Sequence, residues 1–225
     1  MPTFVILAAL VAFAVIAALL VHAGRGAPDP ASRALRVFAQ QTQGQYARQF
    51  AGFGRMVALE ADGWLLTFKV SSGLAGPGES IASFRQLSAY GEYRQLRPFV
   101  LELTPKAVAS RSLTLAVDRP PVATLVIPEV DDVYSIRTTV IPLAAALLRD
   151  PQVLARLVAA CRPTSSLSIG PVHAGLRRRT VVDRGAVAFN EEEEPVTLER
   201  LLAIRDLLTT LLAGLARQQV AGALH

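Results

Sequence analysis

The stretch Thr197–Gln218, TLERLLAIRDLLTTLLAGLARQ, has the clearest secondary-structure pattern downstream of the N-terminal region. Its apolar residues recur with a helical period and form a wide stripe. They are Leu198, Leu201, Leu202, Ile204, Leu208, Leu211, Leu212 and Leu215. Glu199, Arg200, Arg205 and Asp206 lie within the same stretch, and charged side chains are costly in hydrocarbon. We therefore expect a long C-terminal amphipathic helix that covers a sheet and does not span a membrane.

Upstream of this helix, apolar and polar residues alternate as they do in strands. Arg55–Glu60 and Trp64–Val70 are predicted to form a hairpin, because Asp62-Gly63 supplies a left-handed turn. Further strands are expected at Phe99–Leu103, Ser112–Val117, Ala123–Ile127, Val133–Val140, Ser165–Ile169, Leu176–Val182 and Ala186–Phe189. Helices are expected at Ser32–Gln43, with a continuation over Gln45–Phe50, and at Pro142–Arg149 and Asp150–Cys161. The pattern predicts an α+β fold, in which helices cover one face of a mostly antiparallel sheet.

The N-terminal stretch Phe4–Val21 reads FVILAALVAFAVIAALLV and contains no polar side chain. At about 1.5 Å per residue, a helix of this length spans about 27 Å, close to the hydrocarbon core of a bilayer. Summed over its Leu, Ile, Val and Phe residues, insertion is favoured by on the order of 4–7 kcal/mol. The fold class predicted from the sequence therefore includes an N-terminal transmembrane helix, and the lipid bilayer is a predicted partner.

Cleavage of this segment is the alternative interpretation of the N-terminus. Val21-His22-Ala23 matches the small-x-small pattern of a signal-peptide cleavage site. Against cleavage, Met1-Pro2-Thr3 carries no basic side chain and the apolar run is longer than a usual signal peptide. The sequence leaves both interpretations open.

The predicted domain layout has three parts. A transmembrane helix over residues 4–22 is followed by a Gly/Pro-rich linker over 23–31 and a soluble α+β domain over 32–225. Basic residues follow the apolar segment at Arg25, Arg33 and Arg36, and none precedes it. This asymmetry favours a single-pass membrane protein whose soluble domain lies in the cytoplasm and not outside.

The positive net charge does not indicate nucleic-acid binding. The chain carries a formal charge of +5, and only Lys69 and Lys106 among its 23 basic residues are lysines. The arginines are scattered and are not interleaved with aromatic residues as a nucleic-acid-binding stripe would be. A GC-rich coding genome accounts for the excess of arginine, so no nucleic-acid partner is expected.

Cys161 is the single cysteine of the chain, which excludes an intrachain disulfide and a multi-cysteine zinc site. With His173 it could form a thiol and base pair, provided that the fold brought the two together. Cys161 ends an apolar helical pattern with Leu157 and Val158, however, and this pattern is typical of a buried and inert cysteine. We therefore predict no catalytic residue.

Two acidic groups are candidates for metal binding or acid–base chemistry. Glu129, Asp131 and Asp132 precede a predicted strand, and adjacent strand residues point to opposite faces, which disfavours chelation by Asp131 and Asp132 together. The run Glu191–Glu194 precedes the C-terminal helix, where negative charge is favoured by the helix dipole. Both groups are explained by local structure, so no metal and no cofactor are predicted.

Arg177-Arg178-Arg179 is the one basic cluster. On a strand, Arg177 and Arg179 share a face and could contact anionic lipid headgroups. A solvated strand face, or pairing of these arginines with Glu191–Glu194, is the alternative explanation. Arg177 and Arg179 are the two candidate contact residues that the sequence provides.

Function is the least constrained property of the sequence. No phosphate-binding loop, dinucleotide fingerprint, HExxH helix or paired CxxC is present. The leading hypothesis is a membrane-anchored protein without enzymatic activity, whose soluble domain interacts with a protein or with a membrane surface. A membrane-tethered, hydrolase-like enzyme and a ligand-binding domain are the alternatives, because active sites assembled from distant residues leave no local motif.

Overall fold

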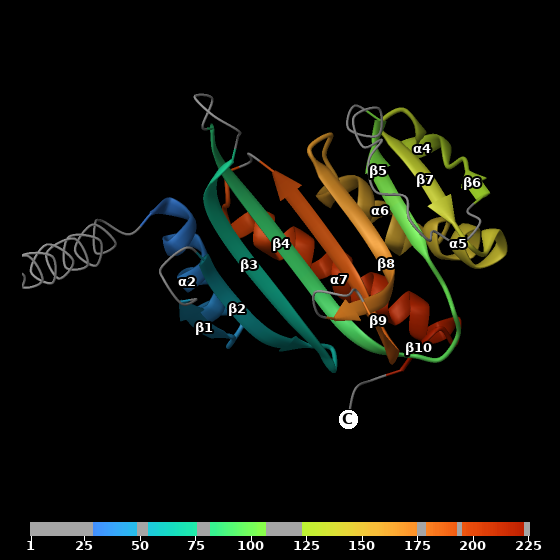
Figure 1. Cartoon of the computed structure of the whole chain (residues 1–225), viewed down its shortest axis with the longest axis horizontal. Coiled ribbons are helices and arrows are strands. Elements are labelled where there is room, and N and C mark those ends of the chain that lie inside the picture. Colours follow the sequence, from blue (N-terminus) through green and yellow to red (C-terminus); the bar gives the residue numbers. More distant parts are fainter. Residues whose placement is uncertain are drawn as a thin grey trace, which may run out of the picture.

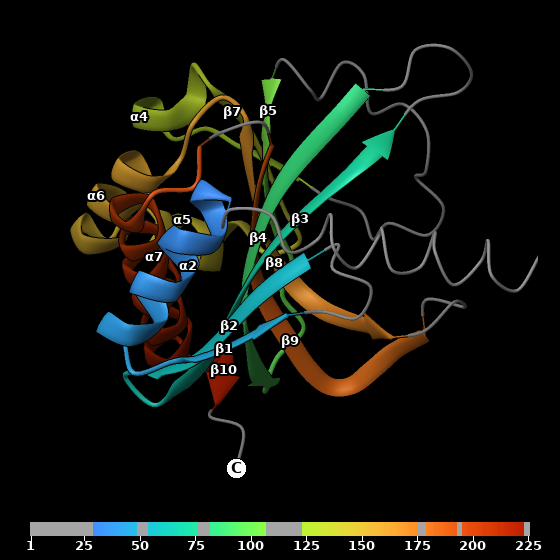
Figure 2. The ribbon, with the colours of Figure 1, turned by 90° about the vertical axis from the view of Figure 1, so that its left-hand side faces the viewer.

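The computed structural model describes residues 29–48, 54–75, 82–106, 123–174, 179–192 and 195–222. These residues form a ten-stranded sheet in which every neighbouring pair of strands is antiparallel. The order across the sheet is β1-β2-β3-β4-β9-β8-β5-β7-β6, and β10 pairs with the end of β4. Figures 1 and 2 show the described helices gathered on one side of this sheet.

The strands are β1 (Gln45–Arg48), β2 (Gly54–Ala61), β3 (Trp64–Ala75), β4 (Ala82–Gln95), β5 (Leu101–Pro105), β6 (Ala123–Leu125), β7 (Tyr134–Thr138), β8 (Ser165–Ala174), β9 (Arg179–Glu192) and β10 (Ala221–Gly222). The helices are α2 (Pro30–Gln41), α4 (Pro128–Asp131), α5 (Ile141–Leu148), α6 (Pro151–Ala160) and α7 (Leu198–Arg217). The sheet is thus built largely from long central strands with short strands at both edges.

Helix α7 is the central element of the helical layer, as the periodicity of its sequence predicts. It begins where the Thr197 side chain accepts a hydrogen bond from the Arg200 amide, and it packs against α2, α5 and α6 as well as the sheet. Most of the predicted apolar stripe is fully buried, at Leu201, Ile204, Leu208, Leu211, Leu212 and Leu215, together with Leu207, whereas Leu198 and Leu202 are partly buried. Burial of this stripe removes most of the apolar area of the helix from water, which is the main stabilising contribution.

Side-chain alternation along the strands gives the sheet two different faces. Along β4, Leu87, Ala89 and Tyr93 point to the helices and are buried. Along β3 and β9, Phe68 and Phe189 do the same. We call this side the covered face. The opposite side, which includes Thr67, Ser88, Tyr90, Asn190 and Ser168, carries no described helix and is called the open face.

Close packing on the covered face explains one glycine. A Cβ atom at Gly185 would lie 2.3 Å from Cζ of Tyr93, which stands opposite it in the register of β4 and β9. The Tyr93 ring therefore lies directly over the backbone of β9. Only glycine leaves room for this ring.

Several predicted elements are confirmed by the structure. The hairpin of β2 and β3 turns at Asp62 and Gly63, whose φ angles are 52° and 77°. The Asp150 side chain caps α6 by accepting hydrogen bonds from the amides of Gln152 and Val153. Both features follow from local sequence, which is why the sequence predicts them.

Other predicted elements are wrong. Gln45–Arg48 is the edge strand β1 and not a continuation of helix α2, and α2 begins after Asp29, not at Ser32. Asp131 ends the short helix α4 and does not open a strand. The chain from Arg179 to Glu192 is one continuous strand, in which Asp183 adopts a φ of 63° where the sequence suggests a turn between two strands.

The predicted fold class also needs correction at the N-terminus. The structure supports a mixed α+β fold with a large antiparallel sheet, and within its described part no helix is long and apolar enough to cross a membrane. The single-pass, transmembrane description is therefore not supported. Phe4–Val21, on which that prediction rested, lies outside the described residues, as does the cleavage motif that ends at Ala23.

Candidate functional site

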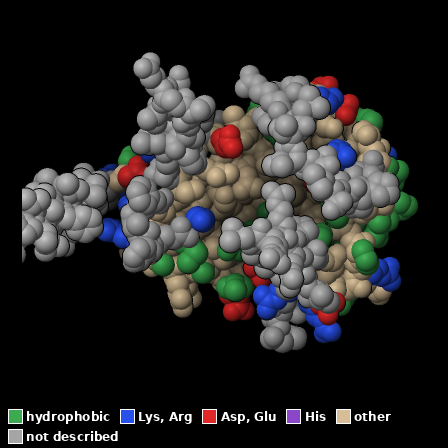
Figure 3. Space-filling model, viewed as in Figure 1, with side chains coloured by type: hydrophobic (Ala, Val, Ile, Leu, Met, Phe, Trp, Pro, Cys, Tyr) green, Lys and Arg blue, Asp and Glu red, His purple; other side chains and the backbone are tan. Residues whose placement is uncertain are grey.

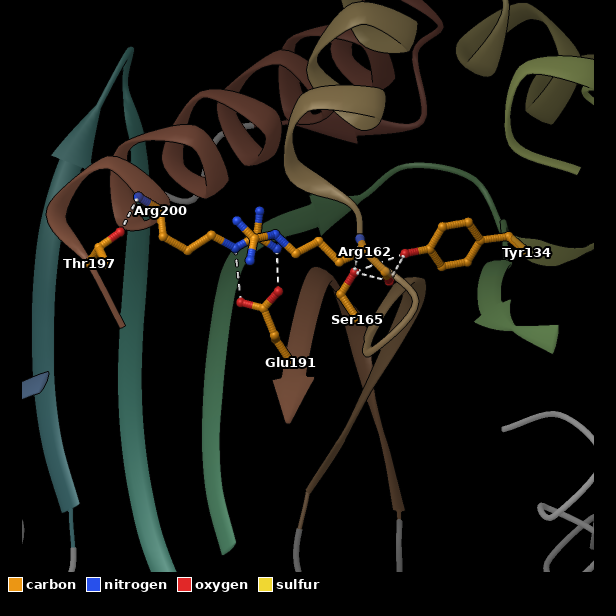
Figure 4. A network of polar contacts seen from close by, with 6 residues as sticks. All are labelled: Tyr134, Arg162, Ser165, Glu191, Thr197 and Arg200. Carbon is orange, nitrogen blue, oxygen red and sulfur yellow. Dashed lines mark hydrogen bonds and ion pairs between the residues drawn. The ribbon is translucent and has the colours of Figure 1, made fainter. Parts of the chain in front are cut away.

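A buried ion pair joins the first turn of α7 to the end of β9 (Figure 4). Nε of Arg200 donates to Oε2 of Glu191 at 2.9 Å, and Nη2 donates to Oε1. The two side chains are only 4% and 1% exposed. The guanidinium also lies 5.5 Å from the centre of the Phe189 ring, a cation–π distance. Each charge is therefore compensated inside the core by several contacts, as a buried charge requires.

A second group of polar contacts lies beside the ion pair, at the end of α6. The Tyr134 hydroxyl of β7 lies 2.8 Å from Oγ of Ser165 and donates to the Arg162 carbonyl. Oγ of Ser165 accepts from the Arg162 amide at 2.7 Å and donates to the Arg162 carbonyl at 2.9 Å. Figure 4 shows these residues joining the end of α6 to β7 and β8. The contacts hold three elements in place at one corner of the fold.

Cys161 belongs to this corner, and its surroundings do not activate it. Burial raises the pKa of the Cys161 thiol to about 11, although the nearby Tyr134 hydroxyl and Arg200 oppose this shift. Burial also raises the pKa of Tyr134 above its ordinary value. The thiol and the phenol are therefore both protonated at neutral pH, so neither is poised as a nucleophile or base.

His173 does not approach this group. It lies near the far end of β8, eight residues beyond Ser165, which corresponds to about 26 Å along an extended strand. Cys161 interacts instead with the side chains of Tyr134 and Ser165. The thiol and base pair considered from the sequence is therefore not brought together.

The acidic candidates are separated in the structure. Asp131 forms an ion pair with Lys106 at 3.6 Å, in a different part of the fold from Glu191, which is buried against Arg200. Within the described ranges, no group of three or more His, Cys, Asp or Glu residues could hold a metal ion. The sequence does not predict the pairing of Glu191 with Arg200, because Arg200 is recognisable there only as a charged residue within a helical pattern.

The predicted lipid contact is not tested by the structure. Arg177 lies outside the described residues, and Arg179 begins β9 opposite Ala174 with its side chain not described. Contact of these two arginines with anionic lipid remains a prediction.

A shallow pocket lies at the start of α6, lined by Arg149, Asp150, Gln152 and Arg217 among others. Burial alone would raise the pKa of Asp150, but hydrogen bonds from the Gln152 and Val153 amides and from Arg217 hold it below its ordinary value. The carboxylate is thus engaged in capping and in an ion pair at 2.7 Å. It is not available as a general base.

The open face carries no described helix, and Figure 2 shows the ends of β8 and β9 curving out on this side of the sheet. The strand registers place Thr67, Tyr90, Ala188 and Ser168 side by side across β3, β4, β9 and β8, and we call this line the middle row. In the next line, Oγ of Ser88 donates to Oδ1 of Asn190 at 2.8 Å. Figure 3 shows the same side of the molecule, where backbone and uncharged polar atoms dominate the part not covered by grey residues.

Charges on the open face are balanced in sign. By strand alternation, the described basic residues that point to this side are Lys69, Arg94, Arg137 and Arg184, and the acidic residues are Glu60, Glu92, Glu102 and Glu192. The open face therefore carries four described positive charges and four described negative charges. Among these described residues neither sign forms a continuous patch, Arg184 pairs with Glu92 at 3.4 Å, and the middle row carries no charge on its four central strands.

No family model matches the chain, and no curated protein matches it. Among solved structures, the crystal structure of the mycobacterial trehalose monomycolate transport factor A, TtfA, is similar to it with a TM-score of 0.42 and 13% sequence identity. The match covers 87% of this chain and 98% of that chain.

Proposed function

We propose that this domain acts by binding a protein partner on the open face of its sheet, and that the buried polar groups serve to hold the fold. The observation that carries the proposal is the contrast between one face sealed by five helices and another without a described helix. The burial and pairing of Glu191 and Arg200, and the protonated state of Cys161, agree with a structural role for the buried groups.

The edges of the sheet are poorly suited to partner binding. The edge strands β1 and β6 contain four and three residues, and Pro128 follows soon after β6. Short edges and prolines are common means of preventing strand addition. The face, and not an edge, is therefore the surface that the partner is proposed to contact.

The balance of charge favours a protein over a membrane surface. Attraction to anionic lipid grows with the number of basic residues at the surface, by about 1 kcal/mol per charge. Among the described residues of the open face, the acidic side chains equal the basic ones in number. Charges of both signs around an uncharged centre instead suit recognition of a complementary protein surface.

Site-specific photocrosslinking in cells tests this proposal. A photoreactive amino acid placed at Ser168, which is exposed on the open face, should give a discrete protein adduct. The matched control places it at Gln152, which is exposed on α6, and should give none. Adding Ala188→Arg, beside Ser168 in the middle row, should abolish the adduct. Absence of an adduct from Ser168, or equal adducts from both positions, would contradict the proposal.

A further inference from the structure

The outer surface of helix α6 is apolar and basic. Among residues 141–164, no acidic side chain is exposed. The exposed apolar residues of α6 lie three or four positions apart or next to one another, and they form a stripe along the helix: Pro151, Ala155, Val158 and Ala159. Arg149, Arg156 and Arg162 are exposed beside this stripe or at its ends. We call these residues the α6 surface, and Figure 2 shows α6 among the helices on the side away from the open face.

The carboxylates that border the α6 surface are already paired. Asp150 accepts hydrogen bonds from two amides of α6 and forms an ion pair with Arg217 at 2.7 Å. Asp206 of α7 contacts Arg205 at 2.6 Å and Arg156 at 3.4 Å. Two carboxylates therefore have three arginines around them, and positive charge is in excess.

Arg149 adds a further positive charge at the start of α6. It makes no ion pair within the described part of the chain. Arg149, Gln152 and Arg217 line one shallow pocket. All three side chains carry N–H donors, and guanidinium groups in particular bind phosphate oxygens through charge-assisted hydrogen bonds. A phosphate group that approaches this end of α6 therefore meets several donors.

We propose that the α6 surface binds an anionic lipid surface. The inference concerns a different surface from the open face and does not depend on the proposed function. Arginines can hold their charge at the level of the headgroups, while the apolar side chains between them contact the boundary of the acyl chains. The equal numbers of charges that argue against a membrane at the open face do not occur here, because no exposed acidic side chain offsets the arginines.

The fold presents the α6 surface on a helix that is held at both ends. On the inner side of the helix, Val153, Leu157 and Ala160 are fully buried. The Asp150 cap fixes the first turn, and the Arg162 amide donates to Oγ of Ser165 just after the last turn. Binding therefore requires no ordering of the helix, which would otherwise weaken it.

An acidic protein is the other occupant that an excess of positive charge would suit. Protein interfaces depend on large anchoring side chains, among which Trp and Tyr are prominent. The exposed residues between 141 and 164 include no aromatic side chain, and alanine and proline are the commonest among them. These small side chains favour contact with lipid over insertion into a protein pocket.

A fluorophore on α6 tests the inference locally. The full-length chain contains the apolar stretch Phe4–Val21, so its overall association with vesicles would not report on α6. An environment-sensitive fluorophore is therefore attached at Ala155→Cys in a Cys161→Ala background. Its emission should shift to the blue with vesicles of equimolar phosphatidylglycerol and phosphatidylcholine, and not with phosphatidylcholine alone. The same label at Ser168→Cys, exposed on the open face, is the matched control and should stay in water.

A charge variant then tests the part played by arginine. Arg149→Gln should lower the ratio of lipid-bound to water-exposed label about fivefold, which is the contribution of one basic residue near an anionic surface. Arg94→Gln makes the same change of net charge on the open face and should leave the ratio unchanged. High salt should release the label in every variant, since it screens exposed charges.

Several results would overturn the inference. They are a label on α6 that stays in water with the anionic vesicles, an equal blue shift with both lipids or at both label positions, and a ratio that Arg149→Gln does not lower. A discrete protein adduct from a photoreactive residue at Gln152 in cells would also overturn it, because a protein and not lipid would then cover α6.

Discussion

On the covered face of the sheet, Phe68, Ala89 and Phe189 are fully buried beneath the helices. One residue away along the same strands, Ser88 and Asn190 of the open face keep part of their surface exposed. The backbone hydrogen bonds of the two faces are shared, so the difference lies entirely in the side chains and in what covers them. The comparison indicates that the covered face contributes most of the stability of the fold. The side chains of the open face are available for contacts outside the chain.

The largest effect is expected from breaking the buried ion pair of the covered face. Arg200→Met leaves the Glu191 carboxylate buried without a charged partner, which should lower the free energy of unfolding by about 3–5 kcal/mol. Denaturant unfolding followed by circular dichroism measures this change. The double variant Arg200→Met with Glu191→Leu should recover most of the loss, because two apolar residues leave no buried charge. Equal stability of the single and double variants would show that burial of the charge is not the cause.

A smaller effect is expected from a pair of glycines, one on each face. Gly185→Ala places a Cβ atom against the Tyr93 ring on the covered face and should cost about 1–3 kcal/mol through overpacking. Gly170→Ala is the matched change on the open face, where the nearest side-chain atom to a new Cβ is 3.6 Å away. It should change stability by less than about 0.5 kcal/mol in either direction. Thermal unfolding of the two variants compares them directly, and similar losses in both would remove the distinction between the faces.

The next smaller effect on stability is expected from the N-terminal cap of α6, in the helical layer. Asp150→Ala removes the side chain that accepts from two amides and should cost about 1 kcal/mol at neutral pH. The pKa of Asp150 is lowered in the folded state, so its contribution is present above the unfolded pKa near 3.8 and is lost as pH falls through the folded value. The stability difference between wild type and variant should therefore shrink below about pH 4. A difference that grows on acidification would contradict this assignment.

The same contrast explains which elements could be predicted from the sequence. Helix α7 shows its apolar stripe every three or four residues, and the β2–β3 hairpin contains a turn dipeptide. Strand β4, which lies at the centre of the sheet, was missed. Its covered face includes the small residues Ala89 and Gly91 and its open face includes Tyr90, so large apolar and polar residues do not alternate strongly along it. A strand whose buried positions hold small residues lacks the large apolar side chains at every second position on which the prediction depends.

The candidate surfaces were harder to predict than the elements. Glu191 appears in the sequence as one member of an exposed acidic run, yet its partner Arg200 lies across the junction between β9 and α7. The pairing depends on the direction in which β9 presents its side chains, and this direction is fixed by the ladder with β4 and β8. Likewise, the open face combines residues from strands far apart in the chain. The spacing of residues within one segment therefore does not predict which residues of other segments lie beside them.

The smallest effect is expected from the polar pair at the centre of the open face. Ser88→Ala removes the hydroxyl that donates to Asn190 at 2.8 Å, in a position where water can replace the lost partner. The free energy of unfolding should therefore fall by about 0.5 kcal/mol or less, measured by the same denaturant titration as for Arg200→Met. A loss above about 1.5 kcal/mol would show that this pair belongs to the cooperative core, as the buried ion pair of Glu191 and Arg200 does. A small loss means that this open-face side chain adds little to folding, so the residue at this position can be selected for contact with a partner.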